Sequence, residues 1–464
     1  MKLTFIGGGG VRTPLAVAAT LRRAQRLGLE ELCLMDVDAE RLHIFGALSR
    51  EVASAAGSPV RITLTTDARE ALEDVRYVIT TFRVGAERGR VLDERIALRH
   101  GVLGQETTGA GGFAMAMRSI PAILDYSDLL EKVSPGAWII NFTNPAGLVT
   151  QALRDRGFCR SIGICDSANG AQHAVAAWLG VDEKRLRAEV FGLNHLSWAR
   201  RVLLDGEEDV LTSLLREPAF LDGTLLRLFA PELVQAIGMW LNEYLYYYYY
   251  SDRALQEIAA QEKTRGEEVL EWNRQLLRQL RAIDVAHSPQ AAREAYNAYM
   301  ARRVATYMEH DESAAPSSGQ GQQHPAGDGS HTPSQAPDDE GYAGVALGVI
   351  ESIETGETLY TALNVPNAGA IACMRPDDVV EVSCLVDGDG VHPLPIGAVH
   401  EPQELLMRTV KLYERLAVRA ILDRSRATAA RALMVHPLVL SYSRATELVD
   451  EYLAAHATYV GAWE

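Results

Sequence analysis

The sequence predicts an α/β fold in which an N-terminal doubly wound parallel sheet is followed by a mixed α+β domain. Three observations predict it. A short apolar strand, Lys2–Ile6, leads into four consecutive glycines and then into a helical pattern near Thr13. Strand-like and helix-like segments then alternate as far as Cys165. Finally, 464 residues exceed one compact core, so a second domain is expected.

Short apolar runs separated by helical patterns are the expected strands of the parallel sheet. They are Lys2–Ile6, Leu32–Met35, Val60–Thr65, Tyr77–Phe82, Trp138–Phe142 and Ser161–Cys165, with helices expected at Asp38–Ala56 and Ile120–Lys132. This alternation is typical of a Rossmann-type sheet. In such a sheet, ligands bind beyond the carboxyl ends of the strands, so the loops there are the first places to look for chemistry.

The glycine turn after the first strand is a candidate dinucleotide site. Backbone without Cβ atoms can approach a pyrophosphate closely, and the N–H groups opening the next helix face the anion. The residues assigned to the cofactor are Gly7, Gly8, Gly9, Gly10, Arg12 and Thr13. Because Arg12 takes the place of the third glycine of the GxGxxG pattern, a plain glycine turn is the alternative.

Asp36 closes the second strand, where an acid accepts hydrogen bonds from the adenosine ribose. Its negative charge would repel a 2′-phosphate, which favours NAD over NADP. Arg41, in the following helix, is assigned to the same site. The alternative for Asp36 is a turn or helix-start residue.

Composition excludes several classes of partner. A formal net charge of −16 argues against binding nucleic acid or an anionic membrane. No apolar run is long enough to span a bilayer, and the strand beginning at Lys2 leaves no room for a signal peptide. The five cysteines are unclustered and odd in number, which suggests a reducing compartment. We therefore expect a cytoplasmic protein without a nucleic-acid or membrane partner.

Arginine is concentrated between the fourth and fifth expected strands. Arg83, Arg88, Arg90, Arg95 and Arg99 lie there in an otherwise acidic protein. One or two of them are candidates to bind an anionic substrate group through the planar guanidinium, and a solvated helix face is the alternative. The glycine-rich run 107–112 is expected to be a loop, either approaching a ligand or simply flexible.

Cys165 and His195 are a candidate metal site. A thiolate and an imidazole both bind divalent metals, and their spacing matches no closed four-ligand site. An open site completed by substrate oxygens is the chemical interpretation, favoured because Cys165 ends a strand on the cofactor side of the sheet. The alternative is that Cys165 is a small buried hydrophobic residue, as most isolated cysteines are.

Three further stretches carry polar candidates with structural alternatives. Asn144, after the fifth strand, either caps a helix or binds sugar hydroxyls. Residues 244–250 hold six tyrosines, which either pack in the core or at a subunit interface, or include a general base if one phenol has a lowered pKa. Arg265 opens a charged helix as an anion ligand or a surface charge.

The C-terminal part is expected to be α+β and mostly structural. Residues 312–340 are rich in Pro, Gly, Ser and Gln and are predicted to be a disordered insertion. Beyond them, the pattern predicts a helix at Ala343–Ile353, strands at Thr358–Asn364 and Val379–Val386, and helices at Gln403–Leu422 and Leu433–Ala455. The expected domains are a NAD-binding unit, 1–195, and a catalytic, substrate-binding and oligomerisation unit, 196–464.

Read together, these blocks resemble glycoside hydrolase family 4, and its 6-phospho-β-glucosidase branch looks most similar. The blocks are IGGGGVRTP, LMDVDAER, FRVG, DERIALRHGVLGQETTGAGGFAMAMRSIP, NFTNPAG, GICD, GLNHLSW and YLYYYYY. The resemblance runs from Met1 to near the C-terminus, interrupted mainly by the low-complexity insertion. This family is the NAD-dependent exception to the two-carboxylate rule for glycosidases.

The resemblance implies an enzyme that hydrolyses 6-phospho-β-glucosides to glucose 6-phosphate and the aglycone. In the family scheme, NAD takes a hydride from sugar C3 while a divalent metal, usually Mn²⁺, acts as a Lewis acid. A tyrosinate removes the C2 proton, the aglycone leaves C1, water adds, and the hydride returns. Phosphorylated disaccharides or aryl glucosides are the implied substrates, and a homodimer or homotetramer is expected.

The family pattern also implies roles for individual residues. It assigns metal binding to Cys165 and His195, the catalytic base to Tyr244, sugar binding to Asn144 and Glu106, and 6-phosphate binding to Arg95 and Arg265.

Two positions depart from the pattern. Asp166 stands where phospho-α-glucosidases use an Asp as an acid on the leaving group and many phospho-β members carry Asn. Phospho-α-glucosidase and α-galactosidase activities therefore stay open, although QETTGAGG and GLNHLSW favour β. Gly10 replaces the usual Ser. Outside the family, the alternatives are a net dehydrogenase of the malate dehydrogenase type and a non-enzymatic NAD sensor.

Overall fold

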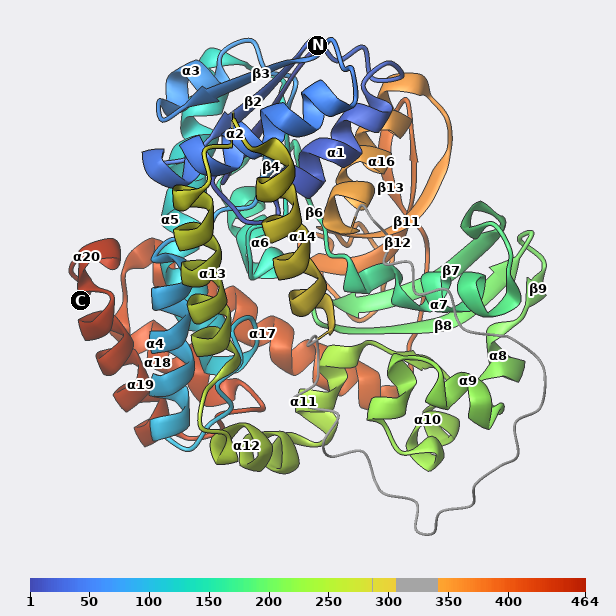
Figure 1. Ribbon diagram of the computed structural model, residues 1–464. Coiled ribbons are helices and arrows are strands. Elements are labelled where there is room, and N and C mark those ends of the chain that lie inside the picture. Colours follow the sequence, from blue (N-terminus) through green and yellow to red (C-terminus); the bar gives the residue numbers. More distant parts are fainter. Residues whose placement is uncertain (286, 306–340) are drawn as a thin grey trace, which may run out of the picture.

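The computed structural model describes residues 1–285, 287–305 and 341–464, which form an α/β fold around one long mixed sheet (Figure 1). The strand order is β10-β8-β7-β12-β11-β6-β5-β4-β1-β2-β3. Its last six strands are parallel and have the Rossmann order 3-2-1-4-5-6. The predicted insertion at 312–340 lies outside the described residues.

The parallel half confirms the predicted strands to within a few residues. Its strands are β1 (Lys2–Ile6), β2 (Glu31–Met35), β3 (Arg61–Thr65), β4 (Tyr77–Thr80), β5 (Trp138–Asn141) and β6 (Ser161–Gly163). Its helices are α1 (Thr13–Arg23), α2 (Ala39–Ala55), α3 (Ala68–Leu72), α4 (Ala86–Arg99), α5 (Gly109–Val133), α6 (Ala146–Asp155) and α7 (Gly170–Leu179). Most positions of β1, β2, β4 and β5 are buried, which explains their unbroken apolar runs.

An antiparallel half extends the same sheet from β6. Its strands are β7 (Leu186–Leu193), β8 (Leu196–Leu204), β9 (Glu208–Asp209), β10 (Trp240–Leu241), β11 (Leu359–Pro366), β12 (Val379–Asp387) and β13 (Gly390–Pro393). Strand β11 pairs with both β6 and β12, and β12 pairs with β7. The predicted strands at β11 and β12 are confirmed, whereas the β7–β8 hairpin was not predicted. The short helices after it are α8 (Leu211–Leu214), α9 (Pro218–Asp222), α10 (Pro231–Ile237), α11 (Tyr246–Tyr249) and α12 (Ser251–Ala260).

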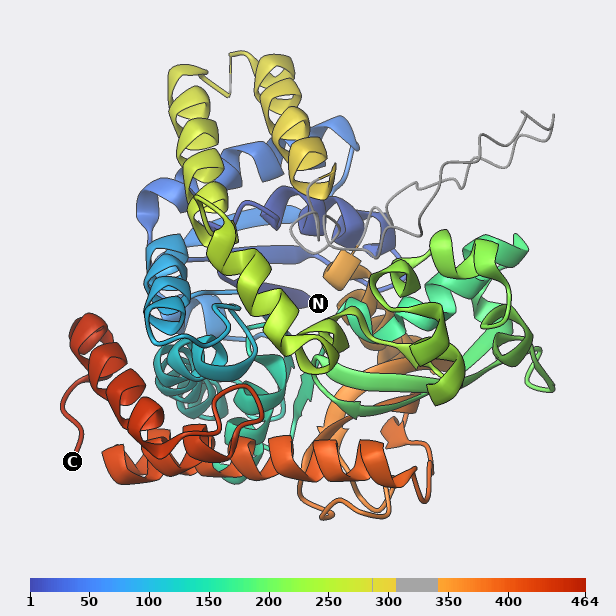
Figure 2. The ribbon, with the colours of Figure 1, turned by 90° about the horizontal axis from the view of Figure 1, so that it is seen from below.

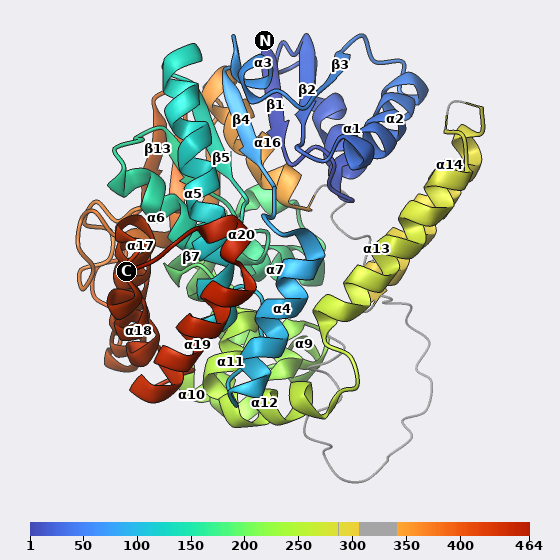
Figure 3. The same ribbon diagram turned by 90° about the vertical axis from the view of Figure 1, so that its left-hand side faces the viewer.

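Two long helices, α13 (Arg265–Ala282) and α14 (Pro289–Ala305), run side by side as a hairpin (Figures 2 and 3). A capping box between Thr264 and Glu267 starts α13. A second apolar cluster joins this hairpin to α2 and the glycine turn through Val11 and Tyr296, among others. The Tyr296 hydroxyl donates to the Val11 carbonyl at 2.8 Å, so α14 lies directly over the cofactor candidates.

The C-terminal helices are α16 (Gly341–Thr355), α17 (Glu401–Asp423), α18 (Arg426–Val435), α19 (Tyr442–Ala455) and α20 (Ala457–Val460), as predicted in outline. Helices α17 to α20 gather beside α4 and α5 (Figures 1 and 3). No helix among the described residues is both long and apolar enough to cross a membrane. All five cysteines are free thiols.

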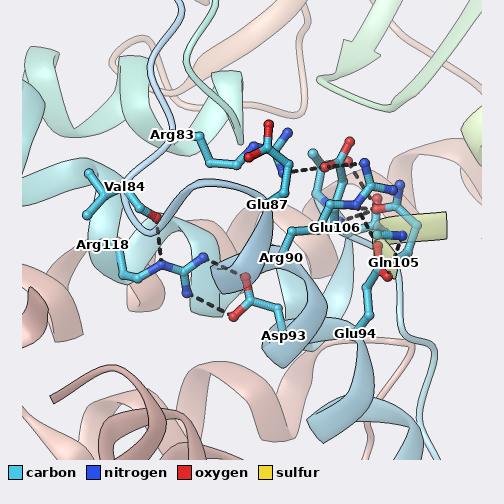
Figure 4. Close-up of polar contacts among 12 residues, drawn as sticks. Arg83, Val84, Glu87, Arg90, Asp93, Glu94, Gln105, Glu106 and Arg118 are labelled. Atoms are coloured by element: carbon cyan, nitrogen blue, oxygen red, sulfur yellow. Dashed lines mark hydrogen bonds and ion pairs between the residues drawn. The ribbon is translucent and has the colours of Figure 1, made fainter. Parts of the chain in front are cut away.

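A buried ion pair fixes α4 against α5. Arg118 holds Asp93 through two hydrogen bonds of 2.8 and 2.6 Å (Figure 4), and His456 adds a contact to Asp93 Oδ1 at 2.7 Å. Asp93 and Arg118 are each no more than 2% exposed. Asp93 therefore connects α4, the helix that also carries Arg90, to α5 and to the end of α19.

We expect Arg118→Met to lower the free energy of unfolding by about 3–5 kcal/mol, because Asp93 would stay buried without its main counter-charge. Urea denaturation followed by circular dichroism measures this loss. The control is Arg99→Met, whose exposed ion pair with Glu451 should contribute less than about 1 kcal/mol. Equal losses in both variants would contradict the assignment of Asp93–Arg118 as an anchor.

Candidate active site

The two candidate metal ligands meet at the predicted edge of the sheet. Cys165 follows β6, His195 lies in the β7–β8 turn, and Cys165 Sγ is 3.5 Å from His195 Nε2. Burial raises the pKa of the Cys165 thiol and lowers the pKa of His195 to about 4. His195 is therefore neutral near pH 7, which is the form that binds metals.

Thr107 fixes which imidazole nitrogen is free. Gln105 Oε1 accepts from the backbone N–H groups of Thr107 and Thr108 at 2.6 and 2.8 Å, so that atom is an acceptor. The Thr107 hydroxyl donates its single proton to Gln105 Oε1 at 3.0 Å. Toward His195 Nδ1, 2.9 Å away, the hydroxyl oxygen can therefore only accept. The lone pair of His195 is thus on Nε2, facing Cys165. The hydroxyl sets the tautomer as outer partners do at metal sites.

A thiol and an imidazole with a fixed tautomer fit a divalent metal in an open site. In the described parts of the chain, no group of three or more His, Cys, Asp or Glu residues could hold a metal. Two protein ligands would therefore leave the remaining positions to water or substrate oxygens.

Tyr244 packs against the Cys165–His195 pair. Its ring stacks on the His195 ring with centroids 3.6 Å apart and an interplanar angle of 0°. Burial, together with the negative groups Glu243, Cys165, Glu106 and Asp166, raises its pKa well above the usual value. The chain's own groups therefore keep this phenol neutral, whereas a general base at this position requires a lowered pKa.

The glycine turn fits a dinucleotide. Gly7 has a φ of +104°, and a Cβ on Gly9 would lie 2.9 Å from Asp36 Oδ2. The Gly9 N–H donates to the same oxygen at 2.9 Å, which brings the ribose candidate against the turn. Helix α1 starts without a side-chain cap, so its N-terminal end is left to a ligand. Thr13, its first residue, is buried beside Gly7 with Oγ1 3.5 Å from the Gly7 carbonyl oxygen.

Arg12 and Arg41 connect the turn to its surroundings. Arg12 Nη1 lies 3.8 Å from Asp166 Oδ2, which links the cofactor turn to the residue after Cys165. Arg41 donates from Nε to the Gly9 carbonyl at 3.2 Å, and its Nη1 pairs with Glu87 at 3.1 Å. Arg41 therefore holds the candidate cofactor turn in place.

We expect Gly9→Ala to weaken NAD binding by about tenfold or more, because the new methyl group would displace Asp36 or the turn itself. Isothermal titration with NAD measures the loss. The control is Gly388→Ala, in the turn before β13, where a Cβ meets nothing closer than 3.4 Å. An unchanged dissociation constant for Gly9→Ala would remove this turn from the cofactor site.

Two arginines, Arg83 and Arg90, bind Glu106 (Figure 4). Glu106 Oε2 pairs with Arg83 Nη1 at 2.6 Å and with Arg90 Nη1 at 3.0 Å, and these charges hold its pKa well below the usual range. Arg303, on α14, also contributes to the low pKa of Glu106, and burial, followed by the charges of Arg12 and Arg90, lowers the pKa of Arg303 itself. Guanidinium groups gathered in a buried site make it a candidate for an anionic ligand.

The two arginines that the family pattern assigns to the phosphate pair with glutamates of α13. Arg95 forms a bidentate ion pair with Glu267 on α13 and donates to the Glu262 carbonyl at 2.9 Å. Arg265 stacks over Trp272 at 4.9 Å and contacts Glu268 and the Arg303 carbonyl, both at 3.4 Å. Arg95 is thus engaged by α13, whereas Arg90 and Arg83 share Glu106. Both were in the predicted arginine cluster, whereas nothing in the local sequence marked Arg303.

The remaining candidates flank the site. Asn144 follows β5, precedes Pro145 through a cis peptide bond, and forms no hydrogen bond through its amide with any residue that the structure describes. Asp166 has a side chain that is 45% exposed and lies beside Arg12. The loop predicted at 107–112 is wrong beyond Thr108, because 109–112 form the first turn of α5. A Cβ on Gly111 would lie 2.1 Å from the Gln105 carbonyl oxygen, so this turn needs glycine to pack on the loop that orients His195.

Comparisons with known proteins agree over nearly the whole chain. Residues 2–181 match the family model described as family 4 glycosyl hydrolase, and residues 190–439 match the C-terminal domain of that family. A probable 6-phospho-beta-glucosidase of Bacillus subtilis is 31% identical over 99% of this chain and 97% of the relative.

Two solved structures show similar folds. One is the 6-phospho-beta glucosidase of Thermotoga maritima with manganese, NAD⁺ and glucose-6-phosphate, at a TM-score of 0.80 and 28% identity over 99% of each chain. The other is a 6-phospho-alpha-glucosidase from gut microorganisms with NAD and glucose-6-phosphate. It has a TM-score of 0.78 and 26% identity, covering 100% of this chain and 99% of that one.

Proposed function

The chain belongs to family 4 of the glycosyl hydrolases, and from this premise we propose that it hydrolyses 6-phospho-β-glucosides with NAD and a divalent metal, Mn²⁺ first. The observation that carries the proposal is the convergence at one sheet edge. The Cys165–His195 pair, the Tyr244 phenol and the Glu106 arginine cluster all lie beyond the strand ends near the glycine turn. The candidate NAD, metal and phosphate sites are then near enough to contact a single bound hexose.

Each group of residues has a distinct task in this proposal. Cys165 and His195 hold the metal, while the glycine turn and Asp36 hold NAD. When bound, NAD would supply a reversible hydride acceptor and the metal would supply Lewis acidity at sugar oxygens. A bound divalent cation would lower the pKa that burial and nearby negative groups raise at Tyr244, so that its phenolate could take a proton from a sugar carbon. The Asn144 amide would bind sugar hydroxyls.

The phosphate is assigned to the Glu106 arginine cluster, with Arg90 first. Burial, and after it the charges of Arg12 and Arg90, lower the pKa of Arg303, and a phosphate dianion would stabilise its charged form. Glu106, already bonded to Arg83 and Arg90, would then orient these two guanidinium groups between sugar and phosphate.

Asp166 favours a second candidate, a 6-phospho-α-glucosidase. Its carboxylate is half-exposed beside Cys165, where it could protonate a leaving group on the α face. Relatives of both names are similar to the chain over almost its full length, so the anomer must be measured.

Matched substrates test the proposal. The chain is incubated with NAD, Mn²⁺ and a thiol reductant, and with either 4-nitrophenyl 6-phospho-β-glucoside or its α-anomer. We expect faster nitrophenol release from the β-anomer, loss of release after removal of metal with EDTA, and no accumulation of NADH. Release that is independent of NAD and metal would contradict the proposal, and NADH formed in proportion to product would indicate a net dehydrogenase.

We also propose that the protein acts in the cytoplasm as a homodimer or homotetramer, with residues 1–195 and 196–464 as its two domains. Five free thiols, including the ligand Cys165, fit a reducing compartment. Light scattering coupled to size-exclusion chromatography measures the subunit number, and a monomer would contradict the assembly.

A further inference from the structure

A buried carboxylate lies behind the Cys165–His195 pair. Glu381, in β12, is 0% exposed. Its Oε1 accepts from the side-chain amides of Asn194 and Asn364, each at 3.3 Å, and its Oε2 accepts from the Ser197 hydroxyl at 3.0 Å. Burial raises its pKa to about 7 against these three donors, and among the described residues no cation pairs with it. A buried carboxylate without a cation is costly, so its position needs a reason.

Two of the three donors flank His195, and the third lies on β11, the strand paired with the one that leads to Cys165. Asn194 and Ser197 stand on either side of His195 in the β7–β8 hairpin. Asn364, in β11, pairs directly with Gly163 in β6, two residues before Cys165. Glu381 thus connects the strand that ends near Cys165 with the turn that presents His195.

His195 needs such support because its backbone is in the left-handed region, with a φ of +62°. A residue with a Cβ atom pays a conformational cost there, and surrounding contacts must hold it in place. Thr107 orients the His195 ring, and the side-chain bonds of Asn194 and Ser197 to Glu381 tether the residues on both sides of His195 to β12.

We propose that Glu381 is a positioning residue that sets the separation of Cys165 Sγ and His195 Nε2 for metal binding. It acts through Asn194, Ser197 and Asn364. This inference rests on the proposed metal site and adds the residue that holds the site together. Residues behind metal ligands typically change metal affinity by 10–100-fold when they are removed.

The test measures metal binding by the full chain, stripped of metal and supplied with NAD. Free Mn²⁺ is followed by electron paramagnetic resonance during titration, and Co²⁺ is followed through its thiolate charge-transfer absorption. We expect Glu381→Leu to weaken Mn²⁺ binding about 10–100-fold and to lower the charge-transfer intensity. Glu381→Gln should restore binding, because its oxygen can accept from both amides while its NH₂ donates to Ser197.

A milder variant and a control guard against misfolding. Ser197→Ala removes one bond to Glu381 and should weaken Mn²⁺ binding about fivefold, the factor that one hydrogen bond is worth. Ser383→Ala, two residues along the same strand, removes bonds of 2.8 and 2.7 Å to β7 at Val190 and Ala188, away from the ligands. It should leave Mn²⁺ affinity close to the wild-type value.

The outcomes separate this inference from the proposed function. If wild type fails to bind Mn²⁺, or binds it equally well after Cys165→Ser, the proposed metal site is wrong. If wild type binds through Cys165 but Glu381→Leu and Ser197→Ala bind as tightly, only the positioning role is overturned. A loss in Ser383→Ala as large as in Ser197→Ala would also overturn it, since any defect in the β7–β12 pairing would then suffice.

Discussion

Replacing Tyr244 with phenylalanine is expected to lower kcat by about 10²–10⁴-fold, the contribution of a positioned general base. The phenyl ring can keep its stacking on His195, so only the hydroxyl is removed. Binding of NAD and Mn²⁺ should therefore stay close to wild type. The measurement is kcat with the 6-phospho-β-glucoside, together with the entry of solvent deuterium at C2 of the product, which should fall in parallel.

A neighbouring tyrosine provides the control. Tyr249 accepts a hydrogen bond from Trp198 Nε1 at 3.1 Å and belongs to the same tyrosine run, but the ring stacked on His195 is that of Tyr244. Tyr249→Phe should keep nearly full activity. If Tyr244→Phe retains kcat, or still exchanges deuterium at C2, another group removes the proton and the stacked phenol is only structural.

The parallel half of the fold could be predicted because its strands are buried and read as short apolar runs. Knowing where β2 and β6 end was then enough to place Asp36 beside Gly9 and Cys165 on the rim. The β7–β8 hairpin could not be predicted from a turn signal, because its left-handed residue is His195 instead of a glycine. That histidine was found from its chemistry alone.

The phosphate candidates show the limit of sequence spacing. Arg90 and Arg95 lie five residues apart on α4, which turns them about 140° from one another around the helix. One therefore points to Glu106 and the other to Glu267. Nothing in the sequence says which face of α4 borders the site, and Arg303 reaches it only because α13 and α14 fold back over the glycine turn. The loop predicted at 107–112 was wrong beyond Thr108 for a related reason. The glycines there allow close packing on Gln105, which is a tertiary contact that the sequence does not show.

Replacing Arg90 with methionine is expected to lower kcat/KM for the 6-phospho-β-glucoside by about 10²–10³-fold, which follows from truncating a buried charge partner. Arg90 has an 11% exposed side chain held between Glu94 and Glu106, so its charge is desolvated and strong. Hydrolysis of the plain 4-nitrophenyl β-glucoside should fall much less, because that substrate has no phosphate to lose. The ratio of the two kcat/KM values, measured with the same preparation, isolates the phosphate contribution from any general damage.

Arg95→Met makes this comparison decisive, because the family pattern favours Arg95 and the geometry favours Arg90. Arg95 is bound to Glu267 with a 35% exposed side chain, so its loss should change the ratio little. Were Arg95→Met to collapse the preference for phosphorylated substrates while Arg90→Met preserved it, the phosphate would have to bind on the α13 side of α4. With the opposite result, the arginines around Glu106 recognise the 6-phosphate, and Arg303, whose pKa is lowered by burial and by the charges of Arg12 and Arg90, becomes the next residue to replace.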